Sequence, residues 1–300
     1  MKILITGCRG QLGTELQRQL AEEGCVLGPL PERLRKATVL PVDVDELDIT
    51  DREATINYIR RHQPDTVVNC AAVTNVDGCE TARDAAFRVN AIGPRNLALA
   101  CDKVNARLVH ISTDYVFPGT PNGGVPLDEC AQPAPISAYG QTKLLGEQYV
   151  RNFCRRHIIV RTAWLYSYYG KNFVKTMVRL GRTHDRINVV KDQLGNPTNA
   201  VDLAYHILKL AVSHDYGTYH CTGNGVCSWY DFACEIIRLS GEHCTVKPIS
   251  SAEYAAQHPQ AASRPAWSAL DNRMLRCTVG DGMRDWKTAI QDYFANWDGK

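Results

Sequence analysis

The sequence lacks a long apolar run, a Cys-x-x-Cys pair and an excess of charge of either sign. A membrane-spanning helix needs roughly 18 or more consecutive apolar residues, and the 300-residue chain contains no such stretch. The 34 basic and 32 acidic residues give a formal net charge of +2. Charge therefore gives no reason to expect nucleic acid or an anionic membrane as a partner.

The twelve cysteines are dispersed along the chain. The closest group is Cys221, Cys227 and Cys234, whose spacing does not match that of a zinc site. We therefore expect no metal ligands from spacing and interpret the cysteines as reduced thiols rather than a disulfide framework. Reduced thiols indicate the cytoplasm as the expected compartment.

Short apolar runs alternate with amphipathic patterns from the first residue onward. The runs, which end in small polar residues and suit strands buried on both faces, are Lys2–Thr6, Thr66–Ala72, Leu108–Thr113 and Ile158–Thr162. Helical spacing follows in Gln11–Glu23, Asp51–His62, Arg83–Asn105 and Tyr139–Phe153. This alternation predicts an α/β fold, a Rossmann-like doubly wound parallel sheet.

The second half of the chain is more mixed and predicts a smaller α/β domain at the C-terminus. Its expected elements are a helix at Val201–Val212, a strand at Tyr219–Thr222, a helix capped by Ser228, an irregular segment at Ser250–Leu270 and a helix at Met283–Trp297. We expect residues 1–163, with roughly 192–216, to form the dinucleotide-binding domain. Residues 164–191 and 217–300 would form the substrate domain.

Three glycines follow the first predicted strand at three-residue spacing, Gly7, Gly10 and Gly13. Such spacing lets the backbone turn tightly and approach a pyrophosphate, which the N-terminus of the next helix then binds. A turn with only structural duties is the alternative. Because the motif joins a first strand to a helix, we interpret it as a dinucleotide-binding loop.

The acidic residue expected about 20 positions further on, where it would bind a ribose hydroxyl, is missing from the apolar segment 26–30. Arg9 lies inside the glycine turn instead, and Arg33 and Arg35 follow the expected second strand. Cations here can bind a 2′-phosphate, although they can also be solvated surface residues. This favours NADPH as the cofactor, with NADH as the alternative.

Tyr139 and Lys143 are four residues apart, so both project from one face of a predicted helix. A lysine ammonium can stabilise a phenolate and let tyrosine exchange a proton with a carbonyl oxygen. Thr113 ends a predicted strand at the carboxyl edge of the sheet, where α/β proteins bind ligands. The pattern predicts a hydride-transfer site. A second Tyr-x-x-x-Lys pair, Tyr205 and Lys209, has no such strand end before it and is interpreted as a chance copy.

Ten runs resemble the extended short-chain dehydrogenase/reductase family, and within it the dTDP-4-dehydrorhamnose reductases. They are ITGCRGQLG, LDITD, VVNCAAVTNVDGCE, VNAIGPRNLA, HISTDYVFPG, YGQTKLLGE, RTAWLY, NFVKTM, VVKDQLGNPT and RPAWSALDN, in chain order from Ile5 to Asn272. The resemblance implies reduction of the 4-keto group of dTDP-4-dehydro-L-rhamnose to dTDP-L-rhamnose by NADPH or NADH.

The resemblance also implies roles for individual residues. The catalytic set would be Thr113, Tyr139 and Lys143, with Tyr139 as proton donor. The cofactor would contact Gly7, Arg9, Gly10, Gln11, Leu12, Gly13, Asp48, Ile49, Ala71, Ala72, Val73, Tyr139 and Lys143. The sugar nucleotide would contact Thr113, Asp114 and Trp164, although Trp164 would otherwise be interpreted as a core aromatic. Val73 replaces a residue that is often more polar in the family.

Two alternatives share these features. A sugar-nucleotide epimerase or dehydratase has the same fold and Tyr/Lys pair but turns over without net oxidation. A non-catalytic NADP-binding regulatory subunit, resembling the β subunit of methionine adenosyltransferase, would bind a partner enzyme instead. The resemblance alone adds a homodimer and a bound Mg²⁺ ion as further expectations.

Overall fold

The computed structural model describes residues 1–299 and is built around a six-stranded, wholly parallel sheet with the strand order β12-β7-β6-β5-β1-β4. The strands are β1 (Lys2–Thr6), β4 (Thr38–Val42), β5 (Thr66–Asn69), β6 (Arg107–Thr113), β7 (His157–Thr162) and β12 (Gly217–His220). The chain changes direction between the neighbours β1 and β5. Ligands of doubly wound sheets bind at such a switch point, outside the carboxyl ends of the strands.

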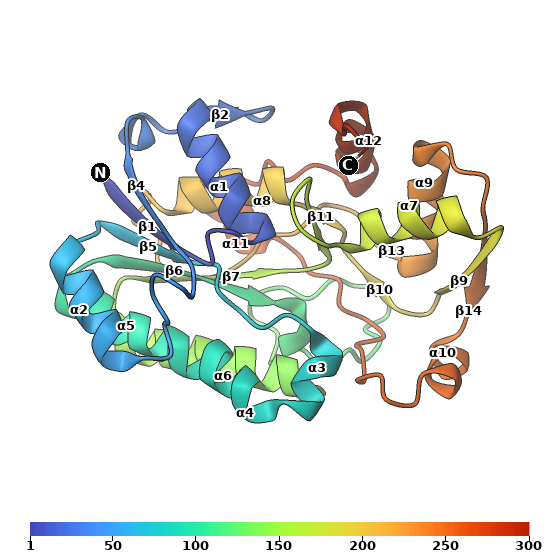
Figure 1. Ribbon diagram of the computed structural model, residues 1–300, viewed down its shortest axis with the longest axis horizontal. Coiled ribbons are helices and arrows are strands. Elements are labelled where there is room, and N and C mark those ends of the chain that lie inside the picture. The colour runs from blue at the N-terminus through green and yellow to red at the C-terminus, as the bar shows by residue number, and fades with distance from the viewer. Residues whose placement is uncertain (300) are drawn as a thin grey trace.

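Helices cover both faces of this sheet, as expected for strands that are apolar on both sides (Figure 1). Alternate residues of β1 show the pattern, because Ile3 and Ile5 pack on one face while Leu4 packs on the other. The first face is covered by α1 (Gln11–Glu22) and α8 (Ala200–Leu210), and the second by α2 (Arg52–His62), α5 (Gly93–Lys103) and α6 (Ala138–Phe153). The predicted fold class is confirmed.

One predicted helix, Arg83–Asn105, is divided into three parts. A short α4 (Arg83–Phe87) leads into a π-helical segment, Arg88–Ile92, which leads into α5. Pro94 stands in the first turn of α5 and has no N–H to donate, so the backbone hydrogen bonds must be rearranged there. The π-helical turn directs Asn90 toward Val73, whose backbone N–H and C=O both bond to the Asn90 amide at 2.9 and 3.0 Å.

The C-terminal half has its own core beside the carboxyl edge of the large sheet (Figure 1). Two parallel strands, β9 (Arg186–Val190) and β14 (Thr245–Ile249), pair there. The helices are α7 (Phe173–Thr183), α9 (Trp229–Ser240), α10 (Ser251–Gln257) and α12 (Trp286–Asn296). Ser228 caps α9 as predicted, in a reciprocal capping box with Asp231. The prediction of an irregular segment at Ser250–Leu270 is wrong at its start, because Ser250 and Glu253 form the capping box of α10.

The boundary between the two halves differs from the predicted one at β12. This strand pairs with β7 at the edge of the large sheet, and α11 (Arg273–Cys277) contributes Leu275 to the same core as Ile3 and Ile5. Segment 217–222 and part of the C-terminal region therefore pack with the first half. The division into a cofactor domain and a substrate domain stays a prediction.

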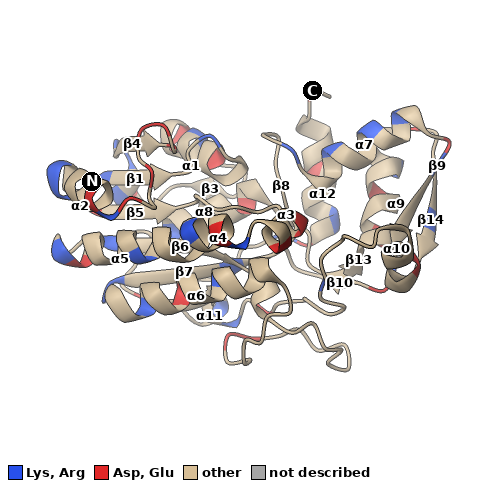
Figure 2. Cartoon of the chain, turned by 60° about the horizontal axis from the view of Figure 1, so that its bottom comes forward, with Lys and Arg blue, Asp and Glu red and all other residues tan. Residues whose placement is uncertain are grey.

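The remaining elements are short connections: β2 (Gly24–Cys25), β3 (Gly28–Pro29), α3 (Val76–Thr81), β8 (Leu165–Tyr166), β10 (Leu194–Gly195), β11 (Thr198–Asn199), β13 (Cys227–Ser228) and two 3₁₀ turns, Glu32–Leu34 and Asp114–Val116. Among residues 1–299, no helix is both long and apolar enough to span a bilayer. Basic and acidic residues are interspersed on the helices in Figure 2.

Candidate active site

A cavity of about 310 Å³ opens at the switch point between β1 and β5. Gly7 lines it with φ of +65°, and a Cβ there would lie 2.7 Å from the backbone nitrogen of Ala71. Gly13 is equally constrained, since its Cβ would lie 2.3 Å from the carbonyl oxygen of Gly7. The chain therefore folds back on itself here only because these positions have no side chain. The turn opens directly into the N-terminus of α1, as a pyrophosphate site requires.

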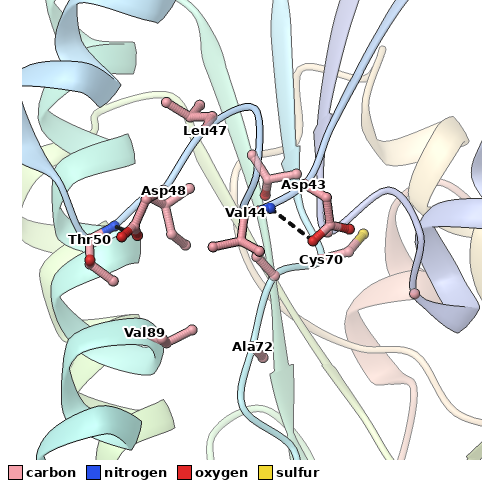
Figure 3. Close-up of a pocket in the computed structure, with 13 residues that line it drawn as sticks. Asp43, Val44, Leu47, Asp48, Thr50, Cys70, Ala72 and Val89 are labelled. Carbon is pink, nitrogen blue, oxygen red and sulfur yellow. Dashed lines mark hydrogen bonds between the residues drawn. The ribbon is translucent and has the colours of Figure 1, made fainter.

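An acidic residue lines this cavity beside the glycine turn, which corrects one expectation. The expectation that no acidic residue follows the second strand is wrong, because segment 26–30 is not a strand of the large sheet. The second strand of the sheet is β4, and Asp43 follows it directly and lines the cavity (Figure 3). Its carboxylate accepts hydrogen bonds from the backbone N–H groups of Arg9 at 3.1 Å and Val44 at 2.9 Å.

The predicted adenine-side residues Asp48 and Ile49 line the same cavity, together with Ala71 and Ala72. Asp48 accepts a hydrogen bond from the backbone N–H of Thr50 at 2.8 Å, so its loop is held in a tight turn (Figure 3). Asp43, Val44, Leu47, Thr50, Cys70 and Val89 also line the cavity and were missed. A polar residue directly after the apolar run Thr38–Val42 was the signal for Asp43.

Two predicted cofactor residues do not line the cavities described here. The Arg9 guanidinium forms ion pairs with Asp45 at 2.6 Å and Glu46 at 2.5 Å on the exposed loop after β4. Val73 is held by its backbone to Asn90. Neither the 2′-phosphate role of Arg9 nor the cofactor contact of Val73 therefore has direct support in the geometry.

The three predicted catalytic residues line one cavity of about 420 Å³. Thr113 ends β6, while Tyr139 and Lys143 lie one turn apart on α6 and are both buried. Gly10, Gln11, Leu12 and Gly13 line the same cavity, and it shares Gly10, Cys70 and Ala72 with the cavity at the switch point. The glycine turn and the predicted proton donor thus lie along one continuous depression.

Burial sets the protonation states of the pair on α6. Loss of solvent raises the pKa of Tyr139, against a hydrogen bond with Thr113 that acts in the opposite direction. The phenol is therefore protonated at neutral pH. Loss of solvent lowers the pKa of Lys143 to about 8, although the nearby Glu147 carboxylate acts in the opposite direction. Lys143 Nζ donates to the carbonyl oxygen of Ile111 at 2.6 Å.

Asp114, a predicted sugar contact, is a buried carboxylate. Its Oδ1 accepts a hydrogen bond from the Thr113 hydroxyl at 2.9 Å, and the carboxylate also interacts with the side chain of Ser268. Burial raises the pKa of Asp114 to about 6. Because an ionised carboxylate can accept about four hydrogen bonds and Asp114 lines the cavity, Asp114 is suited to accept one more from a ligand hydroxyl.

Trp164 lines the same cavity as Thr113, Tyr139 and Lys143. Its φ is +45°, and its indole stacks on that of Trp229 with a centroid distance of 3.5 Å and an interplanar angle of 9°. Trp229 is the first residue of α9 and was not predicted as a site residue. It also lines a third cavity of about 410 Å³ in the C-terminal half. The stacked indoles therefore join the second and third cavities.

The third cavity is lined by aromatic, aliphatic and amide side chains and a single arginine: Phe173, Met177, Leu180, Asn188, Val189, Val190, Gln193, Trp229, Tyr254 and Arg264. These residues come from α7, β9, α9, α10 and two loops. Aromatic rings stack on a nucleobase, while amides form hydrogen bonds with its edge. Sequence reasoning assigned no role to any of them, because the segments meet only in the folded chain.

The second Tyr-x-x-x-Lys pair lies elsewhere. Tyr205 and Lys209 are on α8, where the Tyr205 hydroxyl donates to the carbonyl oxygen of Pro29 at 3.3 Å. Neither residue lines the catalytic cavity. Among residues 1–299, no group of three or more His, Cys, Asp or Glu side chains is placed to hold a metal ion, so nothing supports the expected Mg²⁺.

Comparison with known proteins agrees with this geometry. The family model for the RmlD substrate binding domain matches residues 1–298. A curated dTDP-4-dehydrorhamnose reductase from Aggregatibacter actinomycetemcomitans is 35% identical over 299 residues, which cover 97% of each chain.

Two solved structures are similar over nearly the whole chain. A dTDP-4-dehydrorhamnose reductase from Clostridium acetobutylicum has a TM-score of 0.91 at 48% identity, covering 98% of this chain and 99% of that one. A dTDP-4-dehydrorhamnose reductase from Bacillus anthracis, solved in complex with NADP, has a TM-score of 0.89 at 40% identity and covers 98% of both chains.

Proposed function

This chain belongs to the RmlD substrate binding domain family, and from that premise we propose that it reduces dTDP-4-dehydro-L-rhamnose to dTDP-L-rhamnose with a nicotinamide cofactor. It is an oxidoreductase of dTDP-rhamnose biosynthesis. The observation that carries the proposal is the single cavity lined by Thr113, Tyr139, Lys143 and the glycine turn.

The residues of the switch-point cavity fit a dinucleotide. The turn at Gly7 has no room for a Cβ, and α1 directs its first N–H groups toward the space that a pyrophosphate would fill. Gly10 to Gly13 would bind the pyrophosphate, while Asp48 and Ile49 would flank the adenine. When bound, the nicotinamide supplies the hydride that the substrate C4 accepts.

Tyr139 supplies the proton. Its phenol, held protonated by burial, donates to the C4 keto oxygen as that oxygen gains negative charge, so that the carbonyl becomes a hydroxyl. Thr113 orients this oxygen, and the Asp114 carboxylate, which lines the same cavity, binds a neighbouring sugar hydroxyl. The Lys143 ammonium, one turn along α6, stabilises the phenolate that remains until solvent returns the proton.

The nucleotide half of the substrate occupies the third cavity. Phe173, Trp229 and Tyr254 provide aromatic surface, while Asn188 and Gln193 provide donors and acceptors for a pyrimidine edge. Trp229 lines both this cavity and the catalytic one. Binding of the nucleotide therefore positions the keto sugar, although the residues of the third cavity do not contact the reacting carbon.

We assign NADPH as the physiological cofactor and NADH as an alternative. The Bacillus anthracis relative, solved with NADP, supports NADPH. Asp43 favours NADH instead, because a carboxylate after the second strand can bind the 2′-hydroxyl of NADH and repels the 2′-phosphate of NADPH. Arg9, paired with Asp45 and Glu46, must leave those carboxylates to bind that phosphate.

We further propose that the enzyme works in the cytoplasm as a homodimer. The twelve free cysteines support a reducing compartment. Sedimentation of the purified chain, of 33.4 kDa, would give the mass of one or two subunits and so decide the oligomeric state.

The proposed reaction is tested by following NADPH absorbance while the enzyme turns over dTDP-4-dehydro-L-rhamnose. One NADPH must disappear for each dTDP-L-rhamnose formed. An epimerase or dehydratase would form product with no loss of NADPH. A regulatory subunit would bind NADPH and consume none, which would contradict the proposal.

A further inference from the structure

An ion pair links the C-terminal half to the small helix α3 beside the cofactor half. Arg264 Nη2 lies 3.2 and 3.1 Å from the two carboxylate oxygens of Asp77. Asp77 also accepts a hydrogen bond from the backbone N–H of Ala262 at 2.9 Å, so the loop that carries Arg264 is attached to α3 at two points.

Arg264 lines the third cavity, which the proposed function gives to the nucleotide and which is called the nucleotide cavity from here on. It is the one charged side chain among the described residues that line the nucleotide cavity. Its guanidinium also forms a hydrogen bond with Tyr115, which lines the catalytic cavity and packs edge-on against Tyr139 at 5.5 Å between ring centroids. A nucleotide sugar that spans both cavities has its diphosphate between its base and its sugar, and therefore near this guanidinium.

The pair can be broken by a ligand. The Arg264 and Asp77 side chains keep 24% and 45% of their surface exposed, and partly exposed ion pairs contribute little to stability. A diphosphate offers more negative charge than one carboxylate and a matching geometry for the planar guanidinium. Asp77, in contrast, repels that diphosphate at close range.

We propose that Asp77 competes with the substrate diphosphate for Arg264, so that Arg264 binds the nucleotide and Asp77 limits how tightly it is held. This inference rests on the proposed function. The Arg264 guanidinium exchanges the Asp77 carboxylate for phosphate oxygens when substrate binds and returns to Asp77 as product leaves. Asp77 therefore lowers the affinity of the protein for any ligand that carries the diphosphate and so promotes its dissociation.

A purely structural ion pair makes a different prediction. If Asp77 served only to hold the loop and orient Arg264, its removal would weaken nucleotide binding, as removal of Arg264 would. If Asp77 competes with the diphosphate, removal of Arg264 weakens nucleotide binding, whereas removal of the Asp77 charge strengthens it. Asp77→Asn is the sharpest change, because the amide oxygen of the new side chain can still accept the hydrogen bond from Ala262 while the negative charge is gone.

The test is titration calorimetry of the full-length protein with dTDP and, separately, with thymidine, which has the base but no phosphate. The variants are Arg264→Gln, Arg264→Lys and Asp77→Asn. Asp128→Asn is the matched control, because Asp128 pairs with Arg273 at 2.9 Å on another surface. Unchanged NADPH affinity and thermal melting of each variant show that it is folded.

We expect Arg264→Gln to weaken dTDP binding about 10- to 100-fold, the range for a lost charge-assisted contact, and Arg264→Lys to weaken it less. Asp77→Asn should tighten dTDP binding roughly 3- to 10-fold by removing a nearby like charge. Thymidine affinity should stay within about twofold in every variant, as should dTDP affinity in Asp128→Asn.

Two results would overturn the inference: an unchanged ratio of dTDP to thymidine affinity in Arg264→Gln, or weaker dTDP binding in Asp77→Asn. Failure of the proposed function looks different. In that case the wild-type protein itself would bind neither dTDP nor thymidine and would not oxidise NADPH with the keto sugar.

Discussion

The two halves of the molecule build their parts of the site from different chemistry. The sheet half contributes buried titratable groups, Tyr139, Lys143 and Asp114, at one edge of a parallel sheet. The C-terminal half contributes aromatic and amide surface with one arginine. The first can move a proton, and the second can hold a nucleotide. The two tasks are therefore expected to separate, with kcat responding to changes in the sheet half and KM to changes in the C-terminal half.

Replacement of Tyr139 should give the largest effect and sharpen this separation most. Tyr139→Phe removes the proton donor but keeps the ring that packs against Tyr115. We expect kcat to fall about 10²- to 10⁴-fold, the usual contribution of a general acid, while NADPH and dTDP affinities stay unchanged in calorimetric titrations. Tyr205→Phe in the second Tyr/Lys pair is the control and should leave kcat unaltered; an equal loss there would refute the assignment.

Replacement of Trp229 tests whether the C-terminal half holds the nucleotide. Trp229→Ala removes the indole that stacks on Trp164 and lines the nucleotide cavity. We expect KM for the sugar nucleotide to rise about 10- to 30-fold, as for truncation of a buried aromatic anchor, and kcat to change much less in steady-state assays. A fall in kcat with constant KM would break the proposed division of labour.

The pH dependence of kcat reports Lys143. Its pKa is lowered to about 8, so the fraction that carries the ammonium falls as pH rises through 8. We expect kcat at pH 9 to be about one tenth of that at pH 7. Tyr139 has a raised pKa and keeps its proton over this range, so the decline belongs to the lysine. Lys143→Arg, which stays charged, should flatten the profile between pH 7 and 9.

The smallest expected effect concerns cofactor choice. Asp43→Asn removes a negative charge that lines the switch-point cavity beside the glycine turn. The ratio of kcat/KM for NADPH to that for NADH should rise roughly 3- to 10-fold, because repulsion of the 2′-phosphate is relieved. Asp45→Asn, which alters only the exposed ion pair of Arg9, should change this ratio less. A fall in the ratio for Asp43→Asn would contradict the assigned role of Asp43.

The same contrast explains what the sequence could predict. In a parallel sheet the carboxyl ends of strands meet at one edge, so apolar runs ending at Thr6, Ala72 and Thr113 were enough to place the glycine turn near Thr113, the predicted catalytic threonine. The four-residue spacing of Tyr139 and Lys143 fixed their common helix face. Asp43 was missed because β2 and β3 intervene between α1 and β4, so the acidic residue stands later than the usual spacing.

The nucleotide cavity could not be predicted in this way. Phe173, Gln193, Trp229, Tyr254 and Arg264 come from separate helices and loops, and no period in the sequence relates them. Burial of Tyr139 also could not be inferred. The spacing suggested that Lys143 would lower the tyrosine pKa, whereas loss of solvent dominates and raises it.

The central claim is that cofactor and sugar meet at the cavity of Tyr139, Lys143 and Thr113. It is tested most directly by a single turnover with NADPH deuterated at nicotinamide C4 in the transferred position and dTDP-4-dehydro-L-rhamnose. The account predicts one deuterium at C4 of the product sugar, and labelled product reduced about 10²-fold or more when the same cofactor is incubated with Tyr139→Phe for an equal time. Product without deuterium at C4, or wild-type enzyme that leaves the labelled cofactor unconsumed, would contradict it.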